Sequence, residues 1–264
     1  MQTVRGLEVE WPVWTGSSLP IVVRTAAGRL FTKLRGAAQG TAQLIAEVLV
    51  AELAERIGLR VPMRTLVSLD HSLICRDPNA ELADLLVASR GVNLGFEFLD
   101  GAKPLGPDQV KTIDEDLASQ IVWLDALVQN VDRTAHNPNI LIRDREVWLI
   151  DHGAALPFQY NWATVSEQSP RQPFRFSHLL LERASCLERQ DVRLAEKLSR
   201  ETLQEAVDVI PDSFLTPLLP PGSGPDFLRR RRAAYHTFLW KRLKPPRRFL
   251  GDLLRKQASA RTAG

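Results

Sequence analysis

The sequence predicts an α+β fold in two parts, a small N-terminal part with an antiparallel sheet and one helix, and a larger, mainly helical part. Strand patterns crowd into the first hundred residues, helical spacing dominates after them, and residues 100–107 between the two contain several glycines and prolines. Such residues interrupt regular structure. We therefore assign residues 1–100 to the first part and residues 101–264 to the second.

Three short strands are expected at the start of the chain. Their apolar runs, which alternate only in part, cover residues 7–14, 19–25 and 30–34. Gly16-Ser17-Ser18 separates the first two runs and Ala26-Ala27-Gly28 the last two, and both separators favour turns. The pattern predicts an antiparallel meander.

A helix is expected next, over residues 41–57, where apolar residues recur at helical spacing until Gly58. After Pro62, strands are expected over residues 64–69 and 93–99. These two strands complete the elements that the sequence predicts for the first part.

The second part begins with another helix. Thr112-Ile113-Asp114-Glu115 fits a capping box, and apolar residues continue at helical spacing to Val128. A loop through Asn139 then leads to a hairpin expected over residues 140–150. The last hundred residues are expected to be mostly helical, with a proline-rich loop at 217–225.

The composition excludes several classes of protein. With 44% hydrophobic and 25% charged residues, the chain is neither disordered nor fibrous. Two cysteines, Cys75 and Cys186, cannot form a disulfide framework and fit a reducing compartment. Charged residues interrupt every long apolar run, so we expect no membrane span, and the N-terminus does not resemble a signal peptide. A cytoplasmic, globular protein is expected.

The net charge of +3 conceals a strong asymmetry. Residues 229–264 contain 12 Lys or Arg and one acid, a net +11, whereas the first 228 residues contain 22 bases and 30 acids, a net −8. One interpretation of the basic segment Arg229–Arg248 is nucleic-acid binding. The interpretation that we favour is a C-terminal helix that packs on the body and turns its arginines toward water or acids. The oligomeric state is not indicated.

The loop after the second helix and the end of the hairpin contain the residues that suggest chemistry. Asp132 and Asn137 lie five apart in the loop, and Asp151 ends the hairpin's second strand. Phosphoryl transfer from ATP needs one carboxylate to orient the attacking hydroxyl, and a carboxylate with an amide oxygen to hold Mg²⁺. The spacing matches the kinase pattern H-R-D-x-x-x-x-N followed by D-F-G. We therefore predict Asp132 as the catalytic base, with Asn137 and Asp151 as metal ligands.

The first part supplies candidates for binding the phosphates. Lys33 lies in the third strand, as the phosphate-binding lysine of kinases does. Glu47 on the following helix is its expected ion-pair partner, ahead of Glu52 and Glu55. Gly16-Ser17-Ser18 occupies the place of the kinase loop over the phosphates, and its N–H groups and hydroxyls are expected to bind phosphate oxygens. An ion pair between Asp125 and Arg133 is expected to brace the catalytic loop.

Several runs resemble the bacterial HipA-like kinases. They are Lys33-Leu34-Arg35-Gly36 through Gly58-Leu59-Arg60-Val61-Pro62, Ser89-Arg90-Gly91-Val92-Asn93-Leu94-Gly95, the stretch from Trp123 to Asn139, and Trp148-Leu149-Ile150-Asp151-His152-Gly153-Ala154-Ala155-Leu156. The resemblance spans residues 7–250 and is strongest over 114–156. It implies a two-lobed, protein-kinase-like fold, ATP and Mg²⁺ as cofactors, and phosphorylation of Ser or Thr in a protein substrate. It gives Asp132, Asn137, Asp151 and Lys33 the roles stated above.

Some features depart from the family or leave alternatives open. The chain is expected to be a short form without the N-terminal subdomain of toxin-type HipA proteins. Asn130 stands two residues before Asp132, where aminoglycoside and choline kinases have His, and His152 follows Asp151 in place of Phe. The alternatives are a small-molecule phosphotransferase of that type and a catalytically weak nucleotide-binding module. Ser17 and Ser18 are either autophosphorylation sites, as serines of this loop are in some HipA-like proteins, or polar turn residues.

Overall fold

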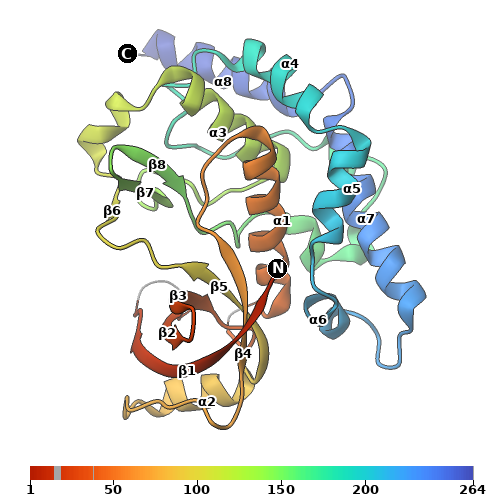
Figure 1. Ribbon diagram of the computed structural model, residues 1–264. Coiled ribbons are helices and arrows are strands. Elements are labelled where there is room, and N and C mark those ends of the chain that lie inside the picture. Colours follow the sequence, from red (N-terminus) through yellow and green to blue (C-terminus); the bar gives the residue numbers. More distant parts are fainter. Residues whose placement is uncertain (15–18, 38, 264) are drawn as a thin grey trace.

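The structure is a computed structural model that describes residues 1–14, 19–37 and 39–263, with the side chains described up to residue 258. Gly16, Ser17 and Ser18, the predicted phosphate-binding loop, lie outside the described residues. The described chain forms a β-barrel, a small hairpin sheet and a group of helices (Figure 1).

Five strands of the first hundred residues close into a barrel in the order β1-β2-β3-β5-β4. They are β1 (Thr3–Pro12), β2 (Ile21–Thr25), β3 (Gly28–Lys33), β4 (Arg64–Leu69) and β5 (Gly91–Glu97). The expected antiparallel meander of β1, β2 and β3 is confirmed. The expectation of a purely antiparallel sheet is wrong, because β1 and β4 pair in parallel, with Thr3 opposite Leu66, and this pairing closes the barrel.

The first hundred residues contain two helices, so the expectation of one helix is also wrong. The expected helix is α1 (Thr41–Ile57), and the second is α2 (Ala80–Ala88). Asn79 caps α2, since its side chain accepts a hydrogen bond from the Leu82 N–H at 2.9 Å. Leu82 is buried with the side chains of the barrel, so α2 covers one end of the barrel (Figure 1).

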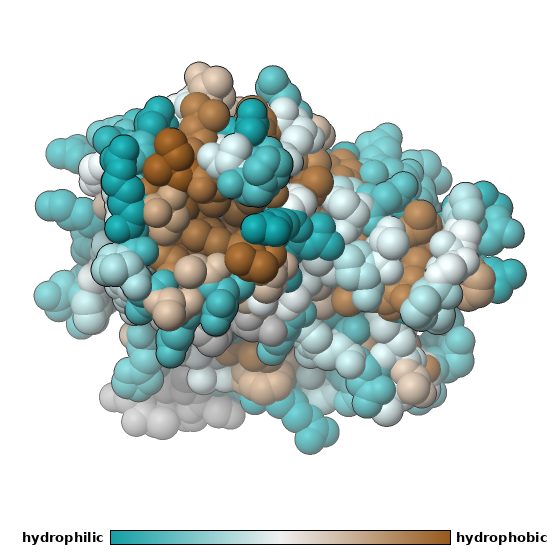
Figure 2. Space-filling model, turned by 90° about the horizontal axis from the view of Figure 1, so that it is seen from below, coloured by the Kyte–Doolittle hydropathy of each residue, from teal (hydrophilic) through white to brown (hydrophobic). Residues whose placement is uncertain are grey.

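Hydrophobic residues gather on the face of the molecule seen from below, over the barrel and α2 (Figure 2). In this part of the chain Val87 is 56% exposed and Ile74 is 47% exposed. Leu85 and Leu86 of α2 are only partly buried against the barrel core. α2 and the segment before it therefore expose more apolar side chains than a surface in contact only with water usually does.

The remaining residues form helices and a hairpin. The helices are α3 (Glu115–Val128), α4 (Leu187–Lys197), α5 (Arg200–Asp208), α6 (Asp212–Leu215), α7 (Pro225–Leu243) and α8 (Arg248–Ala263). Short 3-10 turns are η1 (Pro107–Thr112), η2 (Pro157–Tyr160), η3 (Trp162–Thr164), η4 (Ser169–Arg171) and η5 (Thr216–Leu218). The predicted helix cap at Thr112 is wrong, because the side chain of Asp114 accepts the Leu117 N–H at 3.0 Å.

The predicted hairpin is present as β7 (Ile140–Arg143) and β8 (Glu146–Leu149), with β6 (Lys103–Pro104) beside β7. Its two-residue turn has positive φ at both Asp144 and Arg145, as a type I′ turn requires. The end of β8 lies beside the segment that follows α1, because the Leu149 N–H donates to the Arg60 carbonyl at 2.9 Å.

The largest hydrophobic core runs through α1, α3 and the later helices rather than staying within one half of the chain. Thirteen of the seventeen residues of α1 are buried, including Glu47. A helix that is buried on nearly all sides belongs to the centre of a fold. α1 therefore joins the barrel to the helical part. Over the described residues, no helix is long and apolar enough to cross a membrane.

Candidate active site

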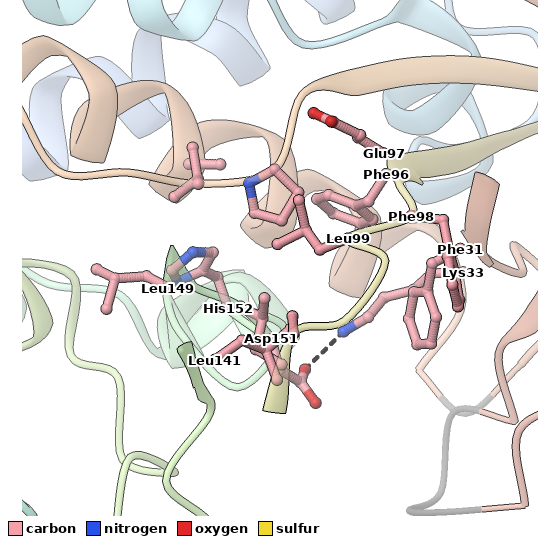
Figure 3. Close-up of a pocket in the computed structure, with 15 residues that line it drawn as sticks. Phe31, Lys33, Phe96, Glu97, Phe98, Leu99, Leu141, Leu149, Asp151 and His152 are labelled. Carbon is pink, nitrogen blue, oxygen red and sulfur yellow. Dashed lines mark hydrogen bonds and ion pairs between the residues drawn. The ribbon is translucent and has the colours of Figure 1, made fainter. Parts of the chain in front are cut away.

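Lys33, Glu47 and Asp151 come together from three separate elements. Lys33 ends β3 and is only 4% exposed. Its ammonium donates to Glu47 Oε1 on α1. It also donates to Asp151 Oδ1 after β8, at 2.6 Å (Figure 3). The expected ion pair between Lys33 and Glu47 is thus present, and it includes the aspartate that the sequence predicts as a metal ligand.

The two competing glutamates of α1 have other partners. Glu52 pairs with Arg56 at 2.9 Å and with Arg64 at 3.0 Å, and Glu55 pairs with Arg64 at 2.6 Å. Glu47 is completely buried. Of the three glutamates of α1, Glu47 is therefore the one whose position lets it pair with Lys33.

Charge in the cluster is set by burial and by the central ammonium. Burial disfavours the charged form of Lys33, but Glu47 and Asp151 outweigh burial and raise its pKa. Burial raises the pKa of Glu47, against the effect of Lys33. Lys33 more than offsets the partial burial of Asp151 and lowers the pKa of that carboxyl. Asp151 is therefore kept ionised at neutral pH, as a metal ligand must be.

The backbone turns sharply at Asp151, where φ is +55°. Gly153, two residues later, lies against Gln43, because an added Cβ there would be 2.5 Å from Gln43 Cγ and would displace that side chain. Between them, the His152 N–H donates to Glu47 Oε2 at 2.9 Å. Both oxygens of Glu47 are thus used, one on Lys33 and one on this turn.

His152 is buried beneath the cluster, with 1% of its surface exposed. Its Nδ1 lies 3.5 Å from the guanidinium of Arg133, and within the described residues its Nε2 has no hydrogen-bond partner. Burial first, and then the charge of Arg133, lower the pKa of His152 to about 3. The imidazole is therefore neutral and acts mainly as an apolar side chain.

We expect stability to depend on pH through His152. Because its pKa is about 3 in the fold and 6.5 ordinarily, the unfolded chain takes up the proton first, and stability is lost as pH falls from 6.5 toward 3. The slope is at most about 1.4 kcal/mol per pH unit for one proton. In urea titrations between pH 7 and pH 5, His152→Phe should lose less stability than wild type. The exposed His71 provides the control His71→Phe, and equal slopes in all three proteins would contradict the assignment.

Asp132 and Asn137 meet in the loop after α3. Asn137 Nδ2 donates to Asp132 Oδ2 at 2.7 Å, and Asn139 Nδ2 donates to the same oxygen at 3.1 Å. The Asn137 amide nitrogen is occupied by this hydrogen bond. The amide oxygen of Asn137 is therefore the atom that remains available to coordinate a metal ion. Asn139 is not among the residues that the sequence predicts for the site, although its position directly after Asn137-Pro138 is a usable signal.

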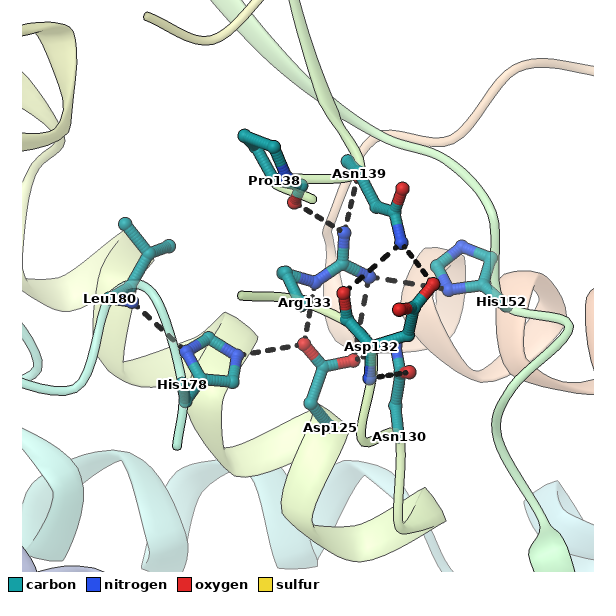
Figure 4. A network of polar contacts seen from close by, with 9 residues as sticks. All are labelled: Asp125, Asn130, Asp132, Arg133, Pro138, Asn139, His152, His178 and Leu180. Atoms are coloured by element: carbon teal, nitrogen blue, oxygen red, sulfur yellow. Dashed lines mark hydrogen bonds and ion pairs between the residues drawn. The ribbon is translucent and has the colours of Figure 1, made fainter. Parts of the chain in front are cut away.

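A buried polar network holds this loop on α3 (Figure 4). The expected ion pair is present, with Arg133 Nε 2.6 Å from Asp125 Oδ2, and both side chains are fully buried. His178 Nε2 lies 2.9 Å from the same carboxylate, and Asn130 Nδ2 donates to it at 3.0 Å. Arg133 also donates to the Asn139 carbonyl. Asp125 thereby fixes both ends of the loop that contains Asp132.

An apolar cavity of about 230 Å³ opens beside Lys33 and Asp151. Aromatic and aliphatic side chains form most of its wall, among them Phe31, Phe96, Leu99, Leu141 and Leu149 (Figure 3). Val61, from the segment between α1 and β4, also lines it. Such a cavity suits a flat, weakly polar ring, with the charged cluster at one side for a polyanionic group.

The chemistry of the two predicted metal ligands suits a hard divalent cation, because Asp151 has a carboxylate and Asn137 an amide oxygen, the ligand types that Mg²⁺ prefers. Magnesium in such sites relies on one or two protein ligands together with substrate phosphates and water. The described residues contain no group of three or more His, Cys, Asp or Glu suited to a metal ion. A site built from one carboxylate and one amide oxygen would not form such a group.

The basic C-terminal segment forms α7 and the start of α8, which pack on the helical core as we favoured. Arg242 is 2% exposed and donates to the Ala126 carbonyl at 2.7 Å and the Pro170 carbonyl at 2.9 Å. Arg247 pairs with Asp191 at 2.6 Å. Burial lowers the pKa of Arg242 to about 10, so it stays charged and acts as a structural connection.

Comparisons with known proteins agree with this geometry. The family model described as HipA-like kinase matches residues 7–216. Among solved structures, the crystal structure of the Helicobacter pylori proinflammatory kinase CtkA is similar, with a TM-score of 0.57 at 11% identity over 96% of each chain. That similarity shows a kinase-like α+β fold. A search of the curated proteins finds no match. Since the family model covers most of the chain, this protein belongs to the HipA-like kinase family.

Proposed function

We propose that the protein is an ATP- and Mg²⁺-dependent kinase that transfers the γ-phosphoryl group of ATP to a Ser or Thr hydroxyl of a protein. The observation that carries the proposal is the convergence of Lys33, Glu47 and Asp151 beside an apolar cavity. Membership of the family supports a kinase-type phosphotransferase. The proposal divides the chain near residue 100, between the last barrel strand and the linker, as the sequence predicts.

Each residue has a proposed role that its surroundings support. Lys33 binds the α- and β-phosphates, and Glu47 holds its ammonium in place. Asp132, which is partly exposed, orients the substrate hydroxyl and accepts its proton. Asn137 and Asp151 hold Mg²⁺, which neutralises phosphate charge when bound. Gly16, Ser17 and Ser18 are proposed to cover the phosphates. Catalysis then depends mainly on positioning and charge.

The small-molecule alternative has less support at Asn130. In this chain Asn130 is 1% exposed, donates to Asp125 at 3.0 Å and accepts the Asp132 N–H at 3.2 Å. Asn130 therefore stabilises the loop that contains Asp132, and its burial keeps it from contacting a substrate. We retain the small-molecule phosphotransferase and the nucleotide-binding module as outcomes of the test.

The test combines binding with transfer. Thermal shifts with ATP, with and without Mg²⁺, are followed by radiolabel transfer from γ-labelled ATP to a cell lysate separated into protein and metabolite fractions. Stabilisation with label in protein on Ser or Thr supports the proposal. Label in the metabolite fraction favours the small-molecule kinase, and stabilisation without transfer favours the module. Absence of any shift would reject the nucleotide site.

Glu47→Gln should lower transfer by about tenfold or more, because it removes the charge that holds Lys33. Lys33 would then pair only with Asp151, whose oxygen is needed for Mg²⁺. The matched control is Glu52→Gln on the same helix, which removes ion pairs to Arg56 and Arg64 on the far side. Initial rates of labelling are compared at equal folded fraction. Equal rates in the two variants would remove Glu47 from the site.

A further inference from the structure

A second cavity, of about 300 Å³, lies where α7 meets α8. None of its lining residues lines the apolar cavity of the proposed active site. Five bases and one acid line it, a net charge of +4, and they are Arg171, Lys241, Arg242, Lys244, Arg248 and Glu167. Such a concentration of positive charge in a hollow costs free energy unless an anion or an acidic residue neutralises it.

Two of the five bases already have partners. Lys241 binds Glu167, with Nζ 2.7 Å from Oε1. Arg242 donates to backbone carbonyls on two sides, among them those of Leu127 at 2.8 Å and Gln172 at 2.8 Å. These bonds fix Arg242 as a rigid wall of the cavity, so the hollow is already formed without a ligand.

The other three bases form no ion pair in the part of the chain that the structure describes, although Arg171 adds to the effect of Lys241 in lowering the pKa of the Glu167 carboxyl. Lys244 lies over the Trp240 ring at 5.3 Å and is otherwise exposed. Arg171 and Arg248 are exposed, and among the described residues neither side chain makes a hydrogen bond or an ion pair. Arg248 also begins the 16-residue helix α8, whose first N–H groups add to the positive potential. Positive charge is thus available inside the cavity.

The rest of the basic segment is engaged elsewhere, which argues against an extended nucleic-acid track. Along α7, Arg229 pairs with Asp226, Arg232 pairs with Asp212 at 2.8 Å, and Arg231 lies over the Trp162 ring at 4.5 Å. Three bases without an ion pair therefore meet at one hollow, whereas Arg230 and Arg231 lie against the aromatic rings of Phe227 and Trp162. A compact, doubly charged anion suits this arrangement better than a polymer backbone does.

We propose that this cavity binds a phosphate group, either free inorganic phosphate or the phosphate monoester of a small ligand. Two guanidinium groups offer paired N–H donors that match phosphate oxygens, and Lys244 adds a third positive charge. The volume corresponds to about ten water molecules, which leaves room for the phosphate and a small organic group. The site is separate from ATP binding and does not depend on the proposed kinase activity.

The experiment titrates inorganic phosphate and phenyl phosphate into the full-length protein by calorimetry. The variants are Arg171→Ala/Arg248→Ala, which removes two exposed bases of the cavity, and Arg229→Ala/Arg230→Ala, which removes the same charge from α7 outside it. Lys33→Met tests for binding at the proposed ATP site. We expect wild type, the α7 variant and Lys33→Met to bind alike, and the cavity variant to bind about tenfold or more weakly.

The outcomes separate the possible ligands. Equal affinity for both probes indicates free phosphate, and tighter binding of phenyl phosphate indicates a phosphorylated metabolite, and either supports the proposal. Equal binding by wild type and the cavity variant overturns it, as does binding that only Lys33→Met abolishes. If neither probe binds while an unphosphorylated oligonucleotide binds wild type but not the cavity variant, the site recognises nucleic acid and the proposal is wrong.

Discussion

Asp132→Ala is expected to lower phosphoryl transfer by about 10²- to 10⁴-fold, the usual contribution of a general base, while ATP and Mg²⁺ still bind. Asp132 is partly exposed in its loop, and its carboxylate oxygen accepts hydrogen bonds from Asn137 and Asn139. Removing the carboxylate takes away the proton acceptor. Lys33 and Asp151 keep their direct contact, so nucleotide binding should persist.

Alanine is the better replacement for Asp132 than asparagine. An asparagine amide would place N–H groups against the donors of Asn137 and Asn139, and the loop would have to rearrange. Label transfer and the thermal shift with ATP and Mg²⁺ are measured on the same preparations. Asp108→Ala, at an exposed aspartate in η1, controls for the loss of one negative charge. Transfer at the wild-type rate in Asp132→Ala would reject its assignment as the base.

Asp125→Ala is expected to lower the free energy of unfolding by about 3–5 kcal/mol, as breaking a buried ion pair does. The substitution would leave the guanidinium of Arg133, which is fully buried, without its counter-charge. Asn130 and His178 would also lose their acceptor. Arg133 and His178 together outweigh the burial of Asp125 and lower the pKa of that carboxyl, so the charge is present throughout the neutral range.

Urea unfolding at pH 7 measures the effect of Asp125→Ala. The matched control is Asp116→Ala on the same helix, whose carboxylate pairs with Arg189 in an exposed position. Exposed pairs contribute little, so the control should unfold close to wild type. A double variant, Asp125→Leu/Arg133→Met, should recover part of the lost stability, because it removes the uncompensated charge. A cost similar to that of the control would mean that the network does not hold the loop.

The sequence predicted most of the local elements and the spacing of the site. The meander, α1 and the β7–β8 hairpin were recognisable because their patterns are regular and end at turn residues such as Gly58. The ion pairs of Lys33 with Glu47 and of Arg133 with Asp125 were also predicted, and both are present. In each pair the residues belong to segments whose places in a kinase-like pattern fix their relative position.

The sequence did not predict α2 or several contacts between residues that are far apart along the chain. The parallel pairing of β1 with β4 joins strands about sixty residues apart, and no local pattern indicates such a contact. α2 is short and almost uniformly apolar, so periodicity did not distinguish it from a loop. Gln43, which fills the space beside Gly153, and His178, which binds Asp125, act through tertiary contacts that spacing does not reveal.

The burial of α1 has a consequence for control of the enzyme. Glu47 reaches Lys33 from a helix whose neighbours Ile45, Val48 and Leu49 are all fully buried. Swinging that helix outward would expose each of these side chains at a cost of about 1.5–3 kcal/mol apiece. No single small effector is expected to supply the sum, so the contact between Glu47 and Lys33 is a permanent part of the architecture. Any regulation of the proposed kinase activity is therefore expected to act on a part of the protein other than this helix.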